Sequence, residues 1–312
     1  MPSASLASVH MSTTTTGRDN ALPRHYGAAY ALTLPFYIVF VLMLVVPLGY
    51  AAYLSLFRTR MVGGTVFSGI ENYIRAVTDA ALLAGIGRML LFLTTSVPLG
   101  LLVSLLLALA LDTGLVRAAR FVRLSIFIPY AVPGVIATLM WGFIYGPTVG
   151  PISQLFSLFG AKPPEFLSAS LITPSMMNIL FWEYVGYNMI IFFAALRNIP
   201  RDLYEAAAID GANQWQVAWY IKLPALRPAL LLTVTFAVIG TFQIFNEPNL
   251  LYPLAPASIG TAFSPNLYVY NLAFVQQNMN YAAAIAFLLA AIVAIISFAV
   301  QSAFQHRAGS MS

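Results

Sequence analysis

The sequence predicts an all-α protein that crosses a membrane several times. Of its 312 residues, 60% are hydrophobic and only 8% are charged, whereas about 25% of an ordinary soluble domain is charged. Several apolar stretches reach the length of about 20 residues that a helix needs to cross a hydrocarbon core of roughly 30 Å. Lipid is therefore the expected solvent for most of the chain.

Six apolar stretches predict six transmembrane helices, at residues 28–57, 89–111, 124–145, 175–196, 229–245 and 281–304. Prolines that can mark kinks fall inside them, at Pro35, Pro47, Pro98, Pro129 and Pro133, since bundled membrane helices tolerate proline. Residues 1–27 are rich in Ser and Thr and predict a disordered cytoplasmic tail, and residues 305–312 predict a second one. The transmembrane domain is then residues 28–304. Met11 is an alternative start to Met1.

The distribution of Lys and Arg predicts the orientation, because cytoplasmic loops carry the excess. With the N-terminus inside, ten of the 15 basic residues lie on the inner side and five on the outer side. Arg58 and Arg60 oppose this orientation, but the outer loop 248–280 has no Lys or Arg. We expect both termini to be cytoplasmic. The outer segments 58–88, 146–173 and 248–280 either meet an external partner or merely cap the bundle.

Several classes of chemistry are excluded by composition. Cysteine is absent and the three histidines, His10, His25 and His306, lie in the tails, so no Cys nucleophile or histidine-based metal site is expected within the membrane domain. The net charge of +5 is scattered and predicts basic loops rather than binding to nucleic acid. We expect neither an enzyme nor a metal site.

The loop 198–228, between the fourth and fifth predicted spans, contains the most specific pattern. Pro200, Asp202 and Glu205 favour the start of a short helix. Gly211 can take the left-handed conformation that ends it, and a second helix can run up to Pro224. The prediction is a helix–turn–helix elbow on the cytoplasmic side. It has small residues at 206–208 and 211, and apolar anchors at Leu203, Tyr204, Trp215 and Trp219.

This elbow has two interpretations. Small residues let another backbone approach closely, and exposed apolar anchors usually mark an interface. The alternative is a re-entrant turn that packs against its own bundle.

The pattern E-A-A, three residues, G, nine residues, I-x-L-P runs from Glu205 to Pro224. It resembles the signature of the permeases of binding-protein-dependent ATP-driven (ABC) importers, and the six-span layout of residues 30–304 resembles their type I fold. The resemblance implies that this loop docks in a groove of a cytoplasmic ATPase and couples its closure to the membrane helices. The implied coupling residues are Glu205, Ala206, Ala207, Asp210, Gly211, Leu223 and Pro224. Trp219 stands near a position where the family often has a different aromatic residue, which is a mild departure from the pattern.

The same resemblance implies the partners. They are two copies of the ATPase, a second homologous permease, and an extracellular or periplasmic solute-binding protein, at a bacterial plasma (inner) membrane. A phosphate-binding loop needs Lys followed by Ser or Thr, but Lys162 and Lys222, the only two lysines, precede Pro and Leu. ATP and Mg are therefore expected on the partner ATPase, with no cofactor in this chain.

Shorter motifs at residues 67–73, 128–130, 242–248 and 266–271 resemble carbohydrate importers of the maltose and glycerol-phosphate group, which implies a di- or oligosaccharide substrate. Polar side chains in apolar spans are candidates for the sugar path, because a sugar needs hydrogen-bonding and aromatic partners. They are Glu183, Tyr187 and Asn188 in the fourth span, and Thr235, Phe242, Gln243 and Asn246 in and after the fifth. Each can instead serve helix packing.

An ion-coupled secondary transporter remains the alternative function. In that case Glu183, the acidic residue near mid-span, would be the coupling carboxylate. This alternative leaves the cytoplasmic elbow without a role.

Overall fold

The computed structural model describes residues 26–60, 63–114 and 116–309, and the chain divides into two compact units, of residues 1–50 and 51–312. Most of the predicted N-terminal tail lies outside the described residues. The first unit contains α1 (Tyr26–Phe40), the π-helical turn η1 (Val41–Val45) and the start of α2 (Val46–Ser55). Pro47 lacks the N–H that would bond the carbonyl of Met43, and the helix widens into the π turn over this stretch.

The second unit begins with a small β-hairpin that the all-α prediction did not include. Strands β1 (Phe57–Arg60) and β2 (Gly64–Phe67) pair antiparallel, with Phe57 opposite Phe67. Helix α3 (Glu71–Thr78) follows, and its buried Asn72 donates hydrogen bonds to the carbonyls of Ser55 (2.9 Å) and Phe57 (2.7 Å). The hairpin is thereby tied to the end of α2.

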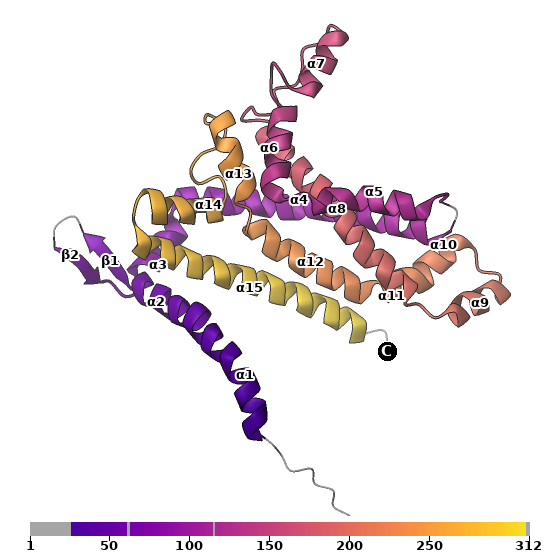
Figure 1. Cartoon of the computed structure of the whole chain (residues 1–312), viewed down its shortest axis with the longest axis horizontal. Helices are drawn as coiled ribbons and strands as arrows, with labels where there is room; N and C mark the ends of the chain where they lie inside the picture. Colours follow the sequence, from indigo (N-terminus) through magenta and orange to yellow (C-terminus); the bar gives the residue numbers. More distant parts are fainter. Residues whose placement is uncertain (1–25, 61–62, 115, 310–312) are drawn as a thin grey trace, which may run out of the picture. The chain divides into compact units, whose positions relative to one another are not determined.

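Four long helices form the framework of the second unit: α4 (Ala80–Asp112), α8 (Ile172–Arg197), α12 (Arg227–Phe242) and α15 (Met279–Gly309) (Figure 1). They match the predicted spans two, four, five and six. Helix α4 begins nine residues before the predicted start, because the Asp79 carboxylate caps its first turn by accepting from the N–H groups of Ala81 and Leu82. Helix α15 continues past the predicted end at residue 304, into the predicted tail.

The third predicted span is not one straight helix. It consists of α5 (Ala119–Ala131) and α6 (Gly134–Ile144), which meet at an angle of 95°. Val132 is extended, with ψ at 127°, because a residue before proline is disfavoured in the helical region. Pro133 therefore marks a break that is sharper than the predicted kink. In the described residues, five helices are long and apolar enough to cross a membrane, or six if the bent pair counts as one span.

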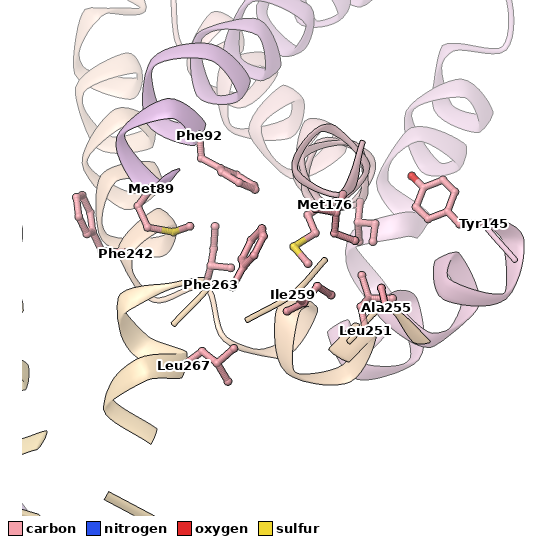
Figure 2. Close-up of a cluster of buried hydrophobic side chains, with 13 residues drawn as sticks. Met89, Phe92, Tyr145, Met176, Phe242, Leu251, Ala255, Ile259, Phe263 and Leu267 are labelled. Carbon is pink, nitrogen blue, oxygen red and sulfur yellow. The ribbon is translucent and has the colours of Figure 1, made fainter. Parts of the chain in front are cut away.

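Short helices connect the long ones at the ends away from residues 198–226. They are α7 (Pro151–Leu158), α13 (Asn246–Leu251), η3 (Tyr252–Leu254), α14 (Pro265–Tyr270) and η4 (Asn271–Val275). The largest buried cluster joins this end to the framework (Figure 2), and it combines Met89 and Phe92 of α4 and Met176 of α8 with Phe242, Leu251, Ile259 and Phe263. These contacts hold the connecting segments between α12 and α15 against the long helices.

A polar cluster reinforces the same end. One carboxylate oxygen of Asp79 accepts hydrogen bonds from the hydroxyls of Tyr281 (2.7 Å) and Tyr268 (2.9 Å), and the Arg75 guanidinium lies 4.0 Å from the Tyr281 ring centroid. Burial acts to raise the pKa of Asp79, but the hydrogen bonds outweigh it and hold the pKa below its usual value. Burial, together with the hydrogen bond to Asp79, raises the pKa of Tyr268 to about 12.

Candidate functional site

The first arm of the predicted elbow is helix α9 (Arg201–Ile209), which follows Pro200 and carries Asp202 in its first turn. Gly211 has a φ of +72°, the left-handed conformation that favours glycine. The N–H of Ala212 bonds back to the carbonyl of Ala207 at 2.9 Å, as is common where a helix ends in a left-handed residue. The predicted helix and its stop at Gly211 are confirmed.

The second arm consists of α10 (Gln214–Val217), the π-helical turn η2 (Ala218–Lys222) and α11 (Leu223–Ala225). Asn213 and Gln216 form a reciprocal capping box, with distances of 2.9 Å and 2.7 Å. This start signal satisfies backbone donors of the first turn. The elbow, defined here as residues 198–226, is therefore two short helical arms, at the end of α12 away from α13 (Figure 1).

The elbow presents large apolar side chains to its surroundings. Ile209 is 87% exposed and Trp215 is 84% exposed, and Trp219 and Tyr220 are also mostly exposed. A cluster of this kind marks an interaction surface. Of the predicted coupling residues, Glu205, Ala206, Asp210 and Gly211 are exposed, Ala207 is buried, and Leu223 and Pro224 are partly buried.

A cavity of about 490 Å³ lies between the long helices of the second unit. Its walls come from α4 (Phe92, Ser96, Val97), α5 (Tyr130), α8 (Leu180 to Asn188), α12 (Thr233 to Thr241) and the segment 243–247. Several lining side chains carry hydroxyl or amide groups among aromatic rings. This combination suits a polar, uncharged ligand with apolar faces.

Four of the seven predicted path residues line the cavity: Tyr187, Asn188, Gln243 and Asn246. The other three lie elsewhere. Phe242 is buried in the cluster of Figure 2, and the Thr235 hydroxyl donates to the Leu231 carbonyl at 2.8 Å. Glu183 is 8% exposed, and its side chain lies against Gly134 at the start of α6.

The segment 243–245 is not helical, whereas the sequence predicts that the path residues of the fifth span lie on one face of a helix. Helix α12 ends at Phe242, so Gln243 and Asn246 no longer follow the spacing of Thr235. Side chains from the opposite segment satisfy the freed carbonyls: Ser264 donates to Ile244 at 2.7 Å and Asn266 donates to Gln243 at 3.2 Å. Non-helical backbone at membrane depth is tolerated where it is bonded in this way or lines a cavity.

Aromatic rings form one wall. The Tyr130 and Tyr187 rings stack with centroids 4.4 Å apart and an interplanar angle of 19°, and Tyr184 packs edge-on to Tyr130 at 6.0 Å. Tyr130 was not among the predicted path residues, although it belongs to one of the short carbohydrate-importer motifs. Pro133, three residues further on, could have drawn attention to it, since a break in a membrane helix often borders a cavity.

Glu247 was also missed. Its side chain is 7% exposed and lines the cavity. The signal was an acidic residue close to the end of an apolar span and followed by Pro248. Among the described residues that line the cavity, none is Lys, Arg or His, so its charged lining is acidic.

The fold and the elbow together define a membrane component of a transport system. Residues 82–309 match the family described as "Binding-protein-dependent transport system inner membrane component". The chain belongs to this family, and it is a multi-pass membrane protein. The resemblance seen in the Glu205–Pro224 signature is thereby confirmed.

Individual relatives agree with this assignment. The chain is 29% identical over 268 residues to a probable ABC transporter permease protein, YurN, of Bacillus subtilis (strain 168), which covers 84% of this chain and 90% of the relative. It is 30% identical over 249 residues to the lactose transport system permease protein LacF of Rhizobium radiobacter, covering 74% and 79%.

Among solved structures, the fold is similar to a chain in the crystal structure of a bacterial alginate ABC transporter in complex with alginate pentasaccharide-bound periplasmic protein. The TM-score is 0.76 at 23% identity, covering 88% of this chain and 92% of that one. This likeness confirms the predicted all-α importer-permease fold.

Proposed function

We propose that this chain is the transmembrane permease subunit of an ATP-driven, binding-protein-dependent importer for a di- or oligosaccharide. The observation that carries the proposal is the exposed apolar elbow, which lies within the residues that match the family of binding-protein-dependent transport system inner membrane components. Two relatives are named as permeases for lactose and for arabinooligosaccharides. The ion-coupled alternative gives the elbow no role and is not supported by the family.

The elbow docks on a separate cytoplasmic ATPase, which supplies ATP binding and hydrolysis. Trp215, Trp219 and Ile209 are the apolar anchors, and the small residues around Gly211 allow close approach of the partner. This chain has no phosphate-binding loop, so it is a non-catalytic subunit. ATP and Mg are held by two copies of the partner.

The cavity belongs to the translocation path, which a second homologous permease completes. In this arrangement both termini and the elbow face the cytoplasm, and the connecting segments between α12 and α15 face the solute-binding protein. The hairpin and α7 lie on that outer side. The excess of Lys and Arg on the elbow side supports this orientation.

The chemistry of the cavity lining restricts the class of solute that the cavity can bind. Stacked tyrosines offer the flat apolar faces of a sugar ring a surface, while Asn188, Gln243 and Asn246 can exchange hydrogen bonds with hydroxyl groups. Glu247, which has no basic neighbour among the described residues of the lining, disfavours a negatively charged solute. We therefore infer an uncharged or amino sugar, in contrast to the acidic polysaccharide of the alginate importer.

Affinity purification in mild detergent tests the proposal. Wild type should recover an ATPase and a second permease, and Glu205→Arg should lose the ATPase while it keeps the permease. The matched control is Glu165→Arg, which changes an exposed carboxylate that pairs with Lys162 outside the elbow. Recovery of wild type without any ATPase would overturn the proposal.

A further inference from the structure

An ion pair between buried Lys222 and the largely buried Asp112 joins the elbow to the helix framework. Lys222 Nζ lies 2.6 Å from Asp112 Oδ2, and the two side chains are only 7% and 11% exposed. The ion pairs Arg58–Glu71 and Lys162–Glu165 are, in contrast, open to solvent. A surface pair contributes little, but separating a buried pair leaves an uncompensated charge and is strongly unfavourable.

Asp112 interacts unfavourably with the dipole of its own helix. Asp112 is the last residue of the 33-residue α4, and the C-terminal end of a helix carries partial negative charge. A carboxylate there is unfavourable for the helix taken alone. The positive charge of Lys222 therefore compensates both the carboxylate of Asp112 and the partial negative charge at the end of α4. The ion pair thus stabilises the contact between the elbow and α4 rather than either element by itself.

Lys222 ends the π-helical turn η2, in the second arm of the elbow. π-helical turns are rare and are frequent at functional sites. The first arm reaches the same point, since the Lys222 ammonium lies 5.7 Å from the centroid of the Tyr204 ring of α9. Burial and the nearby charge of Asp112 raise the pKa of Tyr204, so this tyrosine stays neutral beside the pair. Both arms of the elbow and the end of α4 thus meet at one contact.

The other end of this connection is the cavity wall. Phe92, Ser96, Val97, Gly100 and Leu101 of α4 line the cavity. Between Leu101 and Asp112 the helix rises by about 17 Å at roughly 1.5 Å per residue. Over that distance α4 packs in a buried cluster with Met189, Phe192 and Leu196 of α8 and with Leu226 at the end of the elbow. A close-packed interior has low compressibility and transmits strain, so a displacement at Asp112 is passed along α4 towards the residues that line the cavity.

We propose that the Asp112–Lys222 pair is the positioning contact that fixes the elbow to α4, so that movement of the elbow moves the cavity wall. The Tyr204 ring lies beside Lys222 and brings the first arm of the elbow to the pair. This inference rests on the proposed function, because it assumes that an ATPase moves the elbow. It assigns to two residues outside the cavity a role in opening and closing it.

The test uses the complete complex of permeases and ATPase, with Ser96→Cys as a reporter on the cavity wall. The chain contains no cysteine of its own, so mass spectrometry of this subunit reports the labelling rate of that single thiol with and without ATP. With the native pair, ATP should change the rate several-fold. With Lys222→Met, the ATPase should still co-purify and hydrolyse ATP, but the rate should no longer respond.

Charge exchange separates coupling from folding. Asp112→Lys combined with Lys222→Asp should restore a response to ATP, whereas either reversal alone should abolish it. The matched control Lys162→Met removes a lysine from an exposed pair and should leave the response unchanged. A full response in Lys222→Met, or no restoration in the exchanged pair, would overturn the inference. Absence of an ATPase from the wild-type complex would instead count against the proposed function itself.

Discussion

The elbow and the cavity differ in how directly local sequence determines them. The elbow is a continuous stretch of chain, in which one glycine, one capping box and a few exposed aromatic residues specify two short helices and a surface. The cavity is assembled from α4, α5, α8, α12 and a non-helical segment. Local signals therefore determine the elbow, which we propose as the docking surface, whereas long-range packing determines the cavity, which we propose as part of the sugar path.

Close packing around the cavity should respond most strongly to mutation. A Cβ atom at Gly186 would lie 1.9 Å from the Ile126 carbonyl oxygen, a distance that only backbone movement can relieve. Overpacking commonly costs about 1–3 kcal/mol and occasionally more, and we expect Gly186→Ala to reach or exceed that range. Thermal unfolding in detergent measures this. Gly87→Ala, where a Cβ meets nothing within 4 Å, is the control, and equal unfolding temperatures would contradict the packing of α5 on α8.

Mutation of the turn at Gly211 should reduce transport more than it reduces folding and membrane insertion. Gly211→Val places a β-branched residue at a φ of +72°, where an L-residue is disfavoured by about 1–2 kcal/mol. We expect sugar uptake and stimulated ATP hydrolysis to fall together while membrane insertion persists. Gly211→Asn, which tolerates this conformation better, should retain more uptake. Unchanged uptake in the valine variant would remove the turn from the coupling mechanism.

Substitutions of residues that line the cavity should reduce uptake more than substitutions of nearby polar residues that do not line it. Tyr187→Ala removes a stacked ring from the wall, and we expect uptake to fall about tenfold, in line with roughly 1–2 kcal/mol of lost contact. Thr235→Ala removes a hydroxyl that bonds its own helix and does not line the cavity, and should leave uptake nearly unchanged. Equal losses in initial uptake rate would contradict the location of the path.

The smallest expected effect is on stability at low pH, at the end that holds α13 and α14. The folded-state pKa of Asp79 is below its usual value of 3.8, so its contribution to stability is complete above that value and is lost as pH falls through the folded pKa. Asp79→Asn should therefore lower the unfolding temperature at pH 7 and narrow its difference from wild type towards pH 3. A difference independent of pH would show that the charge of Asp79 is not what stabilises the cluster.

Much of the architecture could be predicted from the sequence because lipid imposes long apolar runs. The spans and Gly211 followed from composition and local conformation. The 95° break at Pro133 and the early start of α4 at the Asp79 cap depend on local geometry that hydrophobicity does not report.

The cavity could be predicted only in part. Tyr187 and Asn188 lie on a continuous helix, so their placement survived. Phe242, the last residue of α12, packs in the buried cluster, whereas Gln243, just past the end of the helix, lines the cavity. Tyr130 and Glu247 lie beside breaks, and only tertiary packing brings them to the same wall.

Uptake into proteoliposomes that contain the purified complex tests the central claim most directly. The measurement compares ATP trapped inside, with no ion gradient, against a proton or sodium gradient without ATP. An oligosaccharide presented with its binding protein should enter only with ATP, and Glu205→Arg should abolish that uptake. Uptake driven by the ion gradient alone, without ATP, would contradict the account.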